Sequence, residues 1–156
     1  MNEFLAQNSD LILRLVLAMG LGMLIGAERL MVKEAAGMKT HALVSLGAAV
    51  FMILSEVMVQ KYIKLPGLNP TMIPSQIIVG IGFLGAGSII LQGSRLVGLT
   101  TAGGLWVTAG IGMAVGFGFY SLAVITTALV LVVLVLVNIL EKPIRKISKD
   151  IDITQV

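Results

Sequence analysis

The feature that most constrains this chain is an apolar tract that fills most of its C-terminal half. No Asp or Glu occurs between Glu56 and Glu141, and Arg95 is the one charged residue between Lys64 and Glu141. The whole sequence is 57% hydrophobic and 12% charged, whereas a soluble domain carries about 25% charged residues. Water would not solvate a folded surface built from such a tract. The sequence therefore predicts a membrane protein.

Five segments are long and apolar enough to cross a bilayer as helices, which takes roughly 17 to 25 residues. The predicted fold class is an all-α, polytopic transmembrane helical bundle formed by residues 1–140. The N-terminus lacks the charged region and cleavage site of a signal peptide, so the first span is interpreted as a retained helix. The predicted spans are 11–27, 42–59, 74–91, 99–119 and 122–140.

The basic residues set the orientation, because Lys and Arg are retained on the cytosolic side. If the N-terminus lies outside, Lys61 and Lys64 are external and residues 141–156 form a short charged cytoplasmic tail. Arg14 lies near the outer end of the first span, where it can reach the interface or pair with Asp10, one helical turn away. The basic residues on the inside are then Arg29, Lys33, Lys39, Arg95, Lys142, Arg145, Lys146 and Lys149.

Glycines recur at helical spacing in three spans. Gly80, Gly82 and Gly85 have the spacing of a dinucleotide-binding turn, but the strand and the later acid that such a turn requires are missing. Small residues four positions apart share a helix face and let helices approach closely in lipid. These faces predict helix packing and a homodimer that a bulky residue at Gly112 would weaken. The predicted packing residues are Gly22, Gly26, Gly82, Ala86, Gly104, Thr108, Gly112 and Gly116.

Polar residues gather on the predicted cytosolic side. Two helix N-termini open there, and a helix N-terminus favours anions. Glu28 and Arg29 therefore have two interpretations: an ion pair that only orders the helix end, or part of an anion-leaning pocket. A magnesium site would need several oxygen ligands, and no metal site is predicted. The predicted polar cytosolic cluster contains Glu28, Arg29, Lys39, Thr40, His41, Arg95, Thr100 and Thr101.

Two other residues also have two interpretations each. Glu56 is either a carboxylate at the external interface near Lys61 or part of a permeation path. His41 is either an interfacial residue at a helix start or a proton relay. Four polar residues are predicted to form hydrogen bonds between helices: Gln76, Ser88, Thr108 and Asn138.

Several functional classes find no support in the sequence. The chain has no cysteine and a single histidine, so no thiolate chemistry, histidine metal site or nucleophile, base and orienter set can be assembled. We therefore expect no enzyme activity and no cofactor. The formal charge of +3, without aromatic stacking platforms, gives no case for nucleic acid.

Four stretches, taken in order and spacing, resemble the membrane domain of the MgtC/SapB family: "GMLIGAERL" from 22, "GMKTHALVSLGAAVF" from 37, "SQIIVGIGFLGAGSII" from 75 and "GLTTAGGLWVTAGIGMAVGFG" from 98. The resemblance implies a multi-pass protein of the bacterial inner membrane, linked in some members to magnesium limitation, virulence or stress adaptation and restraint of the ATP synthase. It covers the membrane domain and not the soluble C-terminal domain of many members. Its motifs match Glu28, Arg29, Lys39, Thr40, His41, Gly98, Thr100 and Thr101.

Two functions from different classes follow. The first is a regulatory protein that contacts membrane lipid, a second copy of itself and another membrane complex such as the ATP synthase. The alternative is a small transporter or channel for magnesium or for an anion such as phosphate, with a path lined by the polar cytosolic cluster.

Overall fold

The computed structural model describes residues 8–62 and 69–153, and side chains as far as residue 141. Four helical segments within these residues are long and apolar enough to cross a membrane: α2 (Ser9–Met31), α3 (Met38–Tyr62), α5 (Leu99–Gly116) and the part of α6 (Tyr120–Ile153) up to Glu141. A fifth helix, α4 (Met72–Gly87), is apolar and shorter. The all-α fold class is confirmed.

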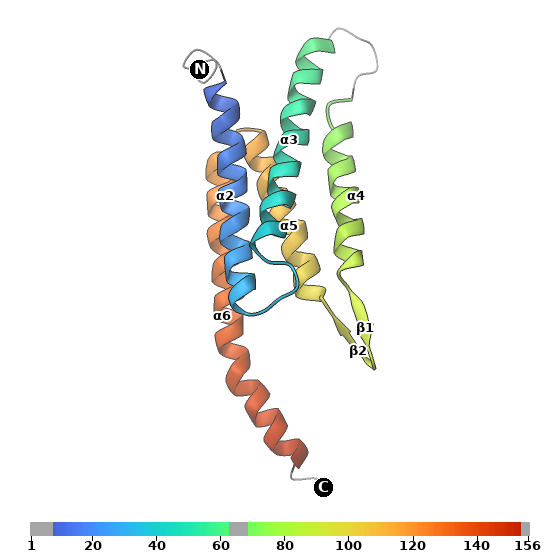
Figure 1. Ribbon diagram of the computed structural model, residues 1–156, viewed down its shortest axis with the longest axis vertical. Helices are drawn as coiled ribbons and strands as arrows, with labels where there is room; N and C mark the ends of the chain where they lie inside the picture. Colours follow the sequence, from blue (N-terminus) through green and yellow to red (C-terminus); the bar gives the residue numbers. More distant parts are fainter. Residues whose placement is uncertain (1–7, 63–68, 154–156) are drawn as a thin grey trace.

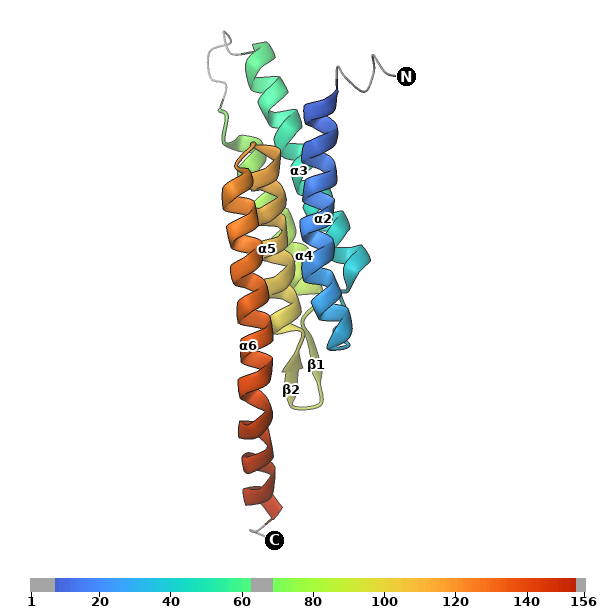
Figure 2. The same cartoon turned by 90° about the vertical axis from the view of Figure 1, so that its left-hand side faces the viewer.

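The helices form an elongated bundle (Figure 1). α2, α3 and α5 pack together, while α4 lies against α5 on one side and α6 lies against α2 and α5 on the other. Figure 2 shows α6 continuing beyond the bundle in the direction in which the strands β1 (Ile90–Gln92) and β2 (Arg95–Val97) project. We call this side the hairpin end, and α2 also ends there.

Two predicted span boundaries are wrong. The third span does not continue to residue 91, because α4 ends at Gly87 and β1 pairs antiparallel with β2. Gly93 supplies the positive φ of the hairpin turn. The fourth span ends at Gly116 rather than at 119, because Gly118, with φ of 80°, turns the chain into α6.

Glycines set the close contacts of α3 with α2 and α5. A Cβ atom on Gly22 would lie 2.6 Å from the backbone oxygen of His41, and one on Gly26 would lie 2.5 Å from Cα of Met38. A Cβ atom on Gly112 would overlap the backbone carbonyl of Ser45. Only glycine permits these backbone approaches. Gly112 thus lies inside a single chain, so its substitution reports on that chain's own packing rather than on a dimer.

The other predicted packing residues divide between buried and open positions. Gly116 is buried against Met52 and Ala49. A Cβ atom on Gly104 would lie 3.3 Å from Cε1 of His41. A Cβ on Gly82 would meet no atom within 4 Å, and Ala86 is exposed. The α4 pair therefore has no partner within the described chain.

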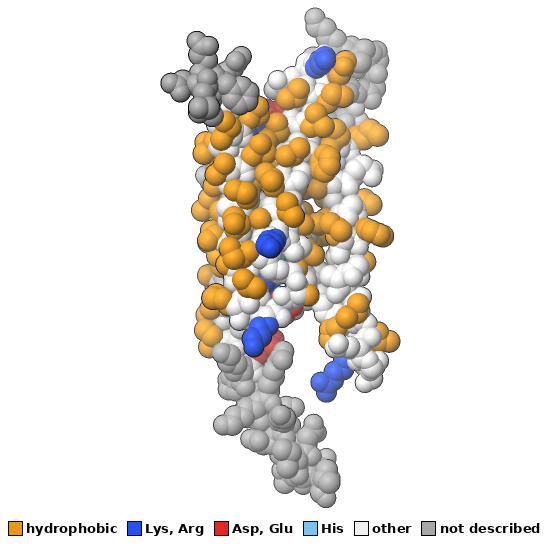
Figure 3. Space-filling model, viewed as in Figure 1, with side chains coloured by type: hydrophobic (Ala, Val, Ile, Leu, Met, Phe, Trp, Pro, Cys, Tyr) orange, Lys and Arg blue, Asp and Glu red, His pale blue; other side chains and the backbone are white. Residues whose placement is uncertain are grey.

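The core between the two ends of the bundle is mostly apolar, with Ser45 and Thr108 also fully buried. Its largest fully buried apolar side chains are Ile25, Met52, Ile111 and Val115. Apolar side chains also cover most of the outer face seen in Figure 3, as expected for a surface that meets lipid.

Candidate functional site

The turn that ends α2 positions Glu34, an acidic side chain of the site. The backbone N–H of Glu34 donates to the carbonyl of Arg29 at 3.0 Å, and the N–H of Lys33 donates to the carbonyl of Leu30 at 3.1 Å. These two bonds form a Schellman motif, whose penultimate residue needs a left-handed backbone. Lys33 adopts it, with φ of 63°. The turn thereby directs Glu34 back toward the bundle.

The first turn of α3 lies inside the bundle rather than at its edge. Met38 packs on Gly26, and α2 continues five residues beyond Gly26 to Met31, which is about 7.5 Å of helix. The connection between the helices therefore turns back along α2. As a result His41 is fully buried, with no exposed surface.

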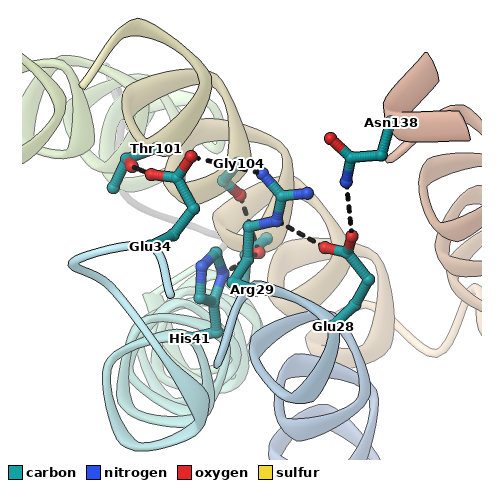
Figure 4. Close-up of polar contacts among 8 residues, drawn as sticks. Glu28, Arg29, Glu34, His41, Thr101, Gly104 and Asn138 are labelled. Atoms are coloured by element: carbon teal, nitrogen blue, oxygen red, sulfur yellow. Dashed lines mark hydrogen bonds and ion pairs between the residues drawn. The ribbon is translucent and has the colours of Figure 1, made fainter. Parts of the chain in front are cut away.

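Five side chains from four parts of the chain form a polar network at the hairpin end (Figure 4). Arg29 Nε donates to Glu28 Oε2 at 2.5 Å, and Asn138 Nδ2 of α6 donates to Glu28 Oε1 at 3.1 Å. Arg29 Nη1 lies 4.0 Å from Glu34 Oε1, and the Thr101 hydroxyl of α5 donates to Glu34 Oε2 at 2.7 Å. The network joins α2, the connection that follows it, α5 and α6.

The central ion pair of this network is sealed from solvent. Glu28 is 5% exposed and Arg29 is 2% exposed. Burying two charges costs several kcal/mol, about as much as their attraction returns, unless further hydrogen bonds satisfy them. The hydrogen bond from Asn138 to Glu28 helps to meet that requirement for the carboxylate. The Glu34 carboxylate, near Arg29, helps to meet it for the guanidinium.

His41 lies beside the network and bonds to α5. Its Nδ1 atom is 2.8 Å from the hydroxyl oxygen of Thr108, and that hydroxyl donates its single proton to the Gly104 carbonyl at 2.7 Å. Thr108 can therefore only accept from the ring, so Nδ1 carries the proton. The other ring nitrogen, Nε2, is buried without a hydrogen-bond partner.

The structure brings together half of the polar residues singled out in the sequence. Glu28, Arg29, His41 and Thr101 are buried at the hairpin end. The remaining four are exposed and form no anion pocket with them, since Arg29 is engaged by two carboxylates. The exposed residues are Lys39, Thr40, Arg95 and Thr100.

Sequence reasoning missed the role of Glu34 and the partner of Asn138. Asn138 was expected to bond between helices, and it does so with Glu28. Thr108 likewise bonds across helices to His41, whereas the Ser88 hydroxyl bonds only within α4, to Gly85. The sequence shows Glu34 only as a carboxylate just past the end of a predicted helix. It gives no indication of the turn that directs this side chain inward.

A second charged cluster lies at the opposite end of the bundle. Arg14 pairs with Asp10 at 2.8 Å, as the helical spacing suggested, and also with Glu56 of α3 at 2.8 Å. Arg14 Nη1, the atom that pairs with Glu56, also donates to the backbone oxygen of Gly116 at 2.8 Å. The hydroxyl of Tyr120 donates to Asp10 at 3.2 Å. Glu56 thus links α3 to α2.

The site has limited chemistry available to it. No group of three or more His, Asp or Glu side chains that could hold a metal ion occurs within the part of the chain that the structure describes. The carboxylates of Glu28 and Glu34 accept hydrogen bonds from neighbouring side chains. The arrangement fastens helix ends together and leaves one buried ring nitrogen unengaged.

Comparison with known proteins decides the family. The model of the MgtC family matches residues 15–143, which include α2 to α5 and the membrane part of α6. The chain belongs to the MgtC family. The buried pair Glu28 and Arg29, and the His41 contact with α5, lie inside the region that the family model matches.

Curated relatives agree with this MgtC-family assignment. The chain is 42% identical over 128 residues to the putative magnesium transporter YhiD of Escherichia coli K12, covering 81% of this chain and 60% of YhiD. It is 45% identical over 120 residues to the protein MgtC of Salmonella typhimurium LT2, covering 77% of this chain and 49% of MgtC. The chain thus spans about half to three fifths of these relatives. No solved structure matches it.

Proposed function

We propose that this chain is a regulatory protein of the bacterial inner membrane, acting through contacts with itself and another membrane complex during adaptation to low magnesium. The observation that carries the proposal is the closed interior of the bundle. The buried pair Glu28 and Arg29 is bonded within the chain, and the core beyond it is filled by apolar residues such as Ile25 and Ile111 together with small buried polar residues such as Ser45. Such an interior supports a scaffold more than a path for ions.

Exposed apolar groups at the hairpin end support a contact with a partner. Leu91 is 68% exposed and Leu96 is 61% exposed, on either strand of the hairpin, with Arg95 beside them. In the predicted orientation this hairpin lies at the cytosolic interface. A surface with apolar residues and one Arg has the composition of a protein interface core.

Crosslinking and copurification from bacterial membranes test the partner contact. We expect a membrane complex, with the ATP synthase as the first candidate, to be recovered with the natural chain. The double variant Arg95→Glu, Leu96→Ser should recover at least several-fold less. Lys61→Glu, an exposed charge reversal at the opposite end of the bundle, is the control. Equal recovery with all three chains would overturn the contact.

The open small-residue pair Gly82 and Ala86 on α4 supports a homodimer at that helix, because small faces favour helix association in lipid. Gly82→Leu should lower the dimer fraction in detergent and in lipid. Gly103→Leu, which also adds bulk where no atom lies within 4 Å, should leave it unchanged.

The alternative is a small transporter or channel for magnesium or an anion such as phosphate. The name of YhiD, putative magnesium transporter, favours it. Glu28 is the group that a cation path would use, since it is the buried carboxylate at the hairpin end. Flux into liposomes separates the two functions.

A further inference from the structure

An elongated apolar groove runs along the membrane face between α3 and α4. It has a volume of about 770 Å³. On α3 its lining extends from Lys39 to Phe51, and on α4 from Met72 to Leu84. Each stretch covers thirteen residues, or about 18 Å of helix. The groove is therefore longer than half of a hydrocarbon core about 30 Å thick, which is the depth of one leaflet.

Glycines make the groove deep at its middle. Gly47 of α3 and Gly80 of α4 line it, and a Cβ atom on either would meet nothing within 4 Å. Val44 and Ile77, both partly buried, contribute apolar walls. A long, narrow, apolar channel of this kind fits an extended alkyl chain.

One charged side chain lines the groove, and it lies at the hairpin end. Lys39 is exposed in the first turn of α3, with Thr40 beside it. No hydrogen bond or ion pair joins the ammonium group of Lys39 to another residue among the side chains described, which extend over residues 8–62 and 69–141. The first turn of α3 lies about 7.5 Å inside the end of α2, a level from which the long Lys39 side chain can extend toward the headgroups. An ammonium group there is stabilised by a phosphate at the same level.

A second copy of the chain fits the groove less well. In a two-fold membrane dimer the same surface patch meets itself, so two Lys39 side chains would approach at one depth. α4 carries no charged residue that could compensate them. A lipid with a net negative headgroup supplies the opposite charge that the chain does not.

We propose that the α3–α4 groove is a binding site for an anionic phospholipid of the leaflet at the hairpin end. One acyl chain fills the groove past Gly47 and Gly80, and the headgroup phosphate pairs with Lys39. The site is separate from the polar network of Glu28 and Arg29, and it does not depend on the regulatory function proposed above.

Native mass spectrometry of the whole protein, purified in detergent and supplied with phosphatidylglycerol or phosphatidylethanolamine, tests the site. We expect one tightly retained phosphatidylglycerol per chain. Lys39→Gln should weaken its retention roughly fivefold, the effect of one basic residue on an anionic headgroup. Gly80→Leu, whose Cβ atom would meet nothing within 4 Å and whose side chain adds bulk to the groove, should abolish retention of either lipid.

The controls separate this lipid from other occupants. Arg95→Gln, an exposed basic residue outside the groove, and Gly103→Leu should retain lipid as the natural chain does. A phosphatidylglycerol with a photoreactive acyl chain should label residues 43–51 and 72–84. Equal retention by Lys39→Gln, Gly80→Leu and the controls would overturn the site. Displacement of the lipid by excess inorganic phosphate would also overturn the site, as would a lipid-free dimer that Gly80→Leu disrupts.

Discussion

Arg29 Nε lies 2.5 Å from Glu28 Oε2, although the two residues are neighbours on α2. Adjacent residues on a helix do not ordinarily face each other. Here both side chains are enclosed, and Glu28 also accepts from Asn138 of α6. The pair therefore acts as a fastening between helices rather than as a charge pair at a helix end.

Removing one charge of this pair should lower the free energy of unfolding more than removing both. Glu28→Gln keeps an acceptor for Asn138 but leaves the buried Arg29 with a distant carboxylate, Glu34, at 4.0 Å. We expect a loss of about 3 kcal/mol in the free energy of unfolding, as for other broken buried pairs. The double variant Glu28→Gln, Arg29→Gln should lose less. Denaturant titration in detergent micelles measures both, and a double variant that loses as much as Glu28→Gln or more would contradict the coupling.

Two buried threonines offer a matched test of the His41 contact. The hydroxyls of Thr108 and Thr127 each donate to the backbone carbonyl four residues earlier, but only Thr108 also accepts from His41 Nδ1. Thr108→Val leaves a buried N–H without an acceptor, which costs about 1 to 3 kcal/mol. Thr127→Val should cost clearly less in the same unfolding measurement. Equal losses would mean that the contact with His41 contributes nothing.

Two glycines on α5 should respond to alanine in opposite directions. A Cβ on Gly112 would overlap the Ser45 carbonyl, whereas one on Gly110 would meet nothing within 4 Å. Gly112→Ala should destabilise the chain by about 1 to 3 kcal/mol or more through overpacking. Gly110→Ala should be neutral or stabilise by up to about 1 kcal/mol, because alanine favours helix more than glycine. Unfolding of both variants at the same denaturant concentration would contradict this prediction.

The left-handed Lys33 predicts a stabilising substitution. A residue with a side chain is strained by roughly 1 kcal/mol or more in this conformation, and glycine is not. Lys33→Gly should therefore raise the free energy of unfolding, while Lys33→Ala, which retains the strained backbone, should not. A gain from alanine equal to that from glycine would rule out relief of backbone strain as the cause.

The cluster around Arg14 should be sensitive to salt. Glu56→Gln removes a partly exposed pair, worth up to about 1 kcal/mol, and Arg14→Gln also removes the bond to the Gly116 carbonyl. The first loss should shrink at high ionic strength, because salt screens exposed charges. Lys61→Gln is the control. Thermal unfolding at low and high salt measures the difference, and losses that do not change with salt would argue against an electrostatic origin.

Hydropathy and charge predicted much of the fold, because lipid requires long apolar helices and positive charge marks one side. They placed Glu28, His41 and Thr101 near one end of the bundle. They could not predict the first strand of the hairpin, since Ile89, Ile90 and Leu91 continue the apolar run of the helix that precedes them.

Details of the site depended on tertiary structure. The Schellman turn that directs Glu34 inward uses a lysine where glycine is usual, so no residue type marked it. Asn138 meets Glu28 from 110 positions away, and Glu56 reaches Arg14 from a different helix. Such pairings are set by how helices pack, which spacing along one helix does not encode.

The most direct test of the regulatory account is flux through the purified protein in sealed liposomes loaded with a magnesium-sensitive dye or a phosphate reporter. Because the Glu28 and Arg29 pair is bonded within the chain and buried from solvent, we predict magnesium and phosphate uptake equal to that of protein-free vesicles. Uptake above that level that is abolished by Glu28→Gln in a folded, correctly inserted protein would contradict the account and establish transport.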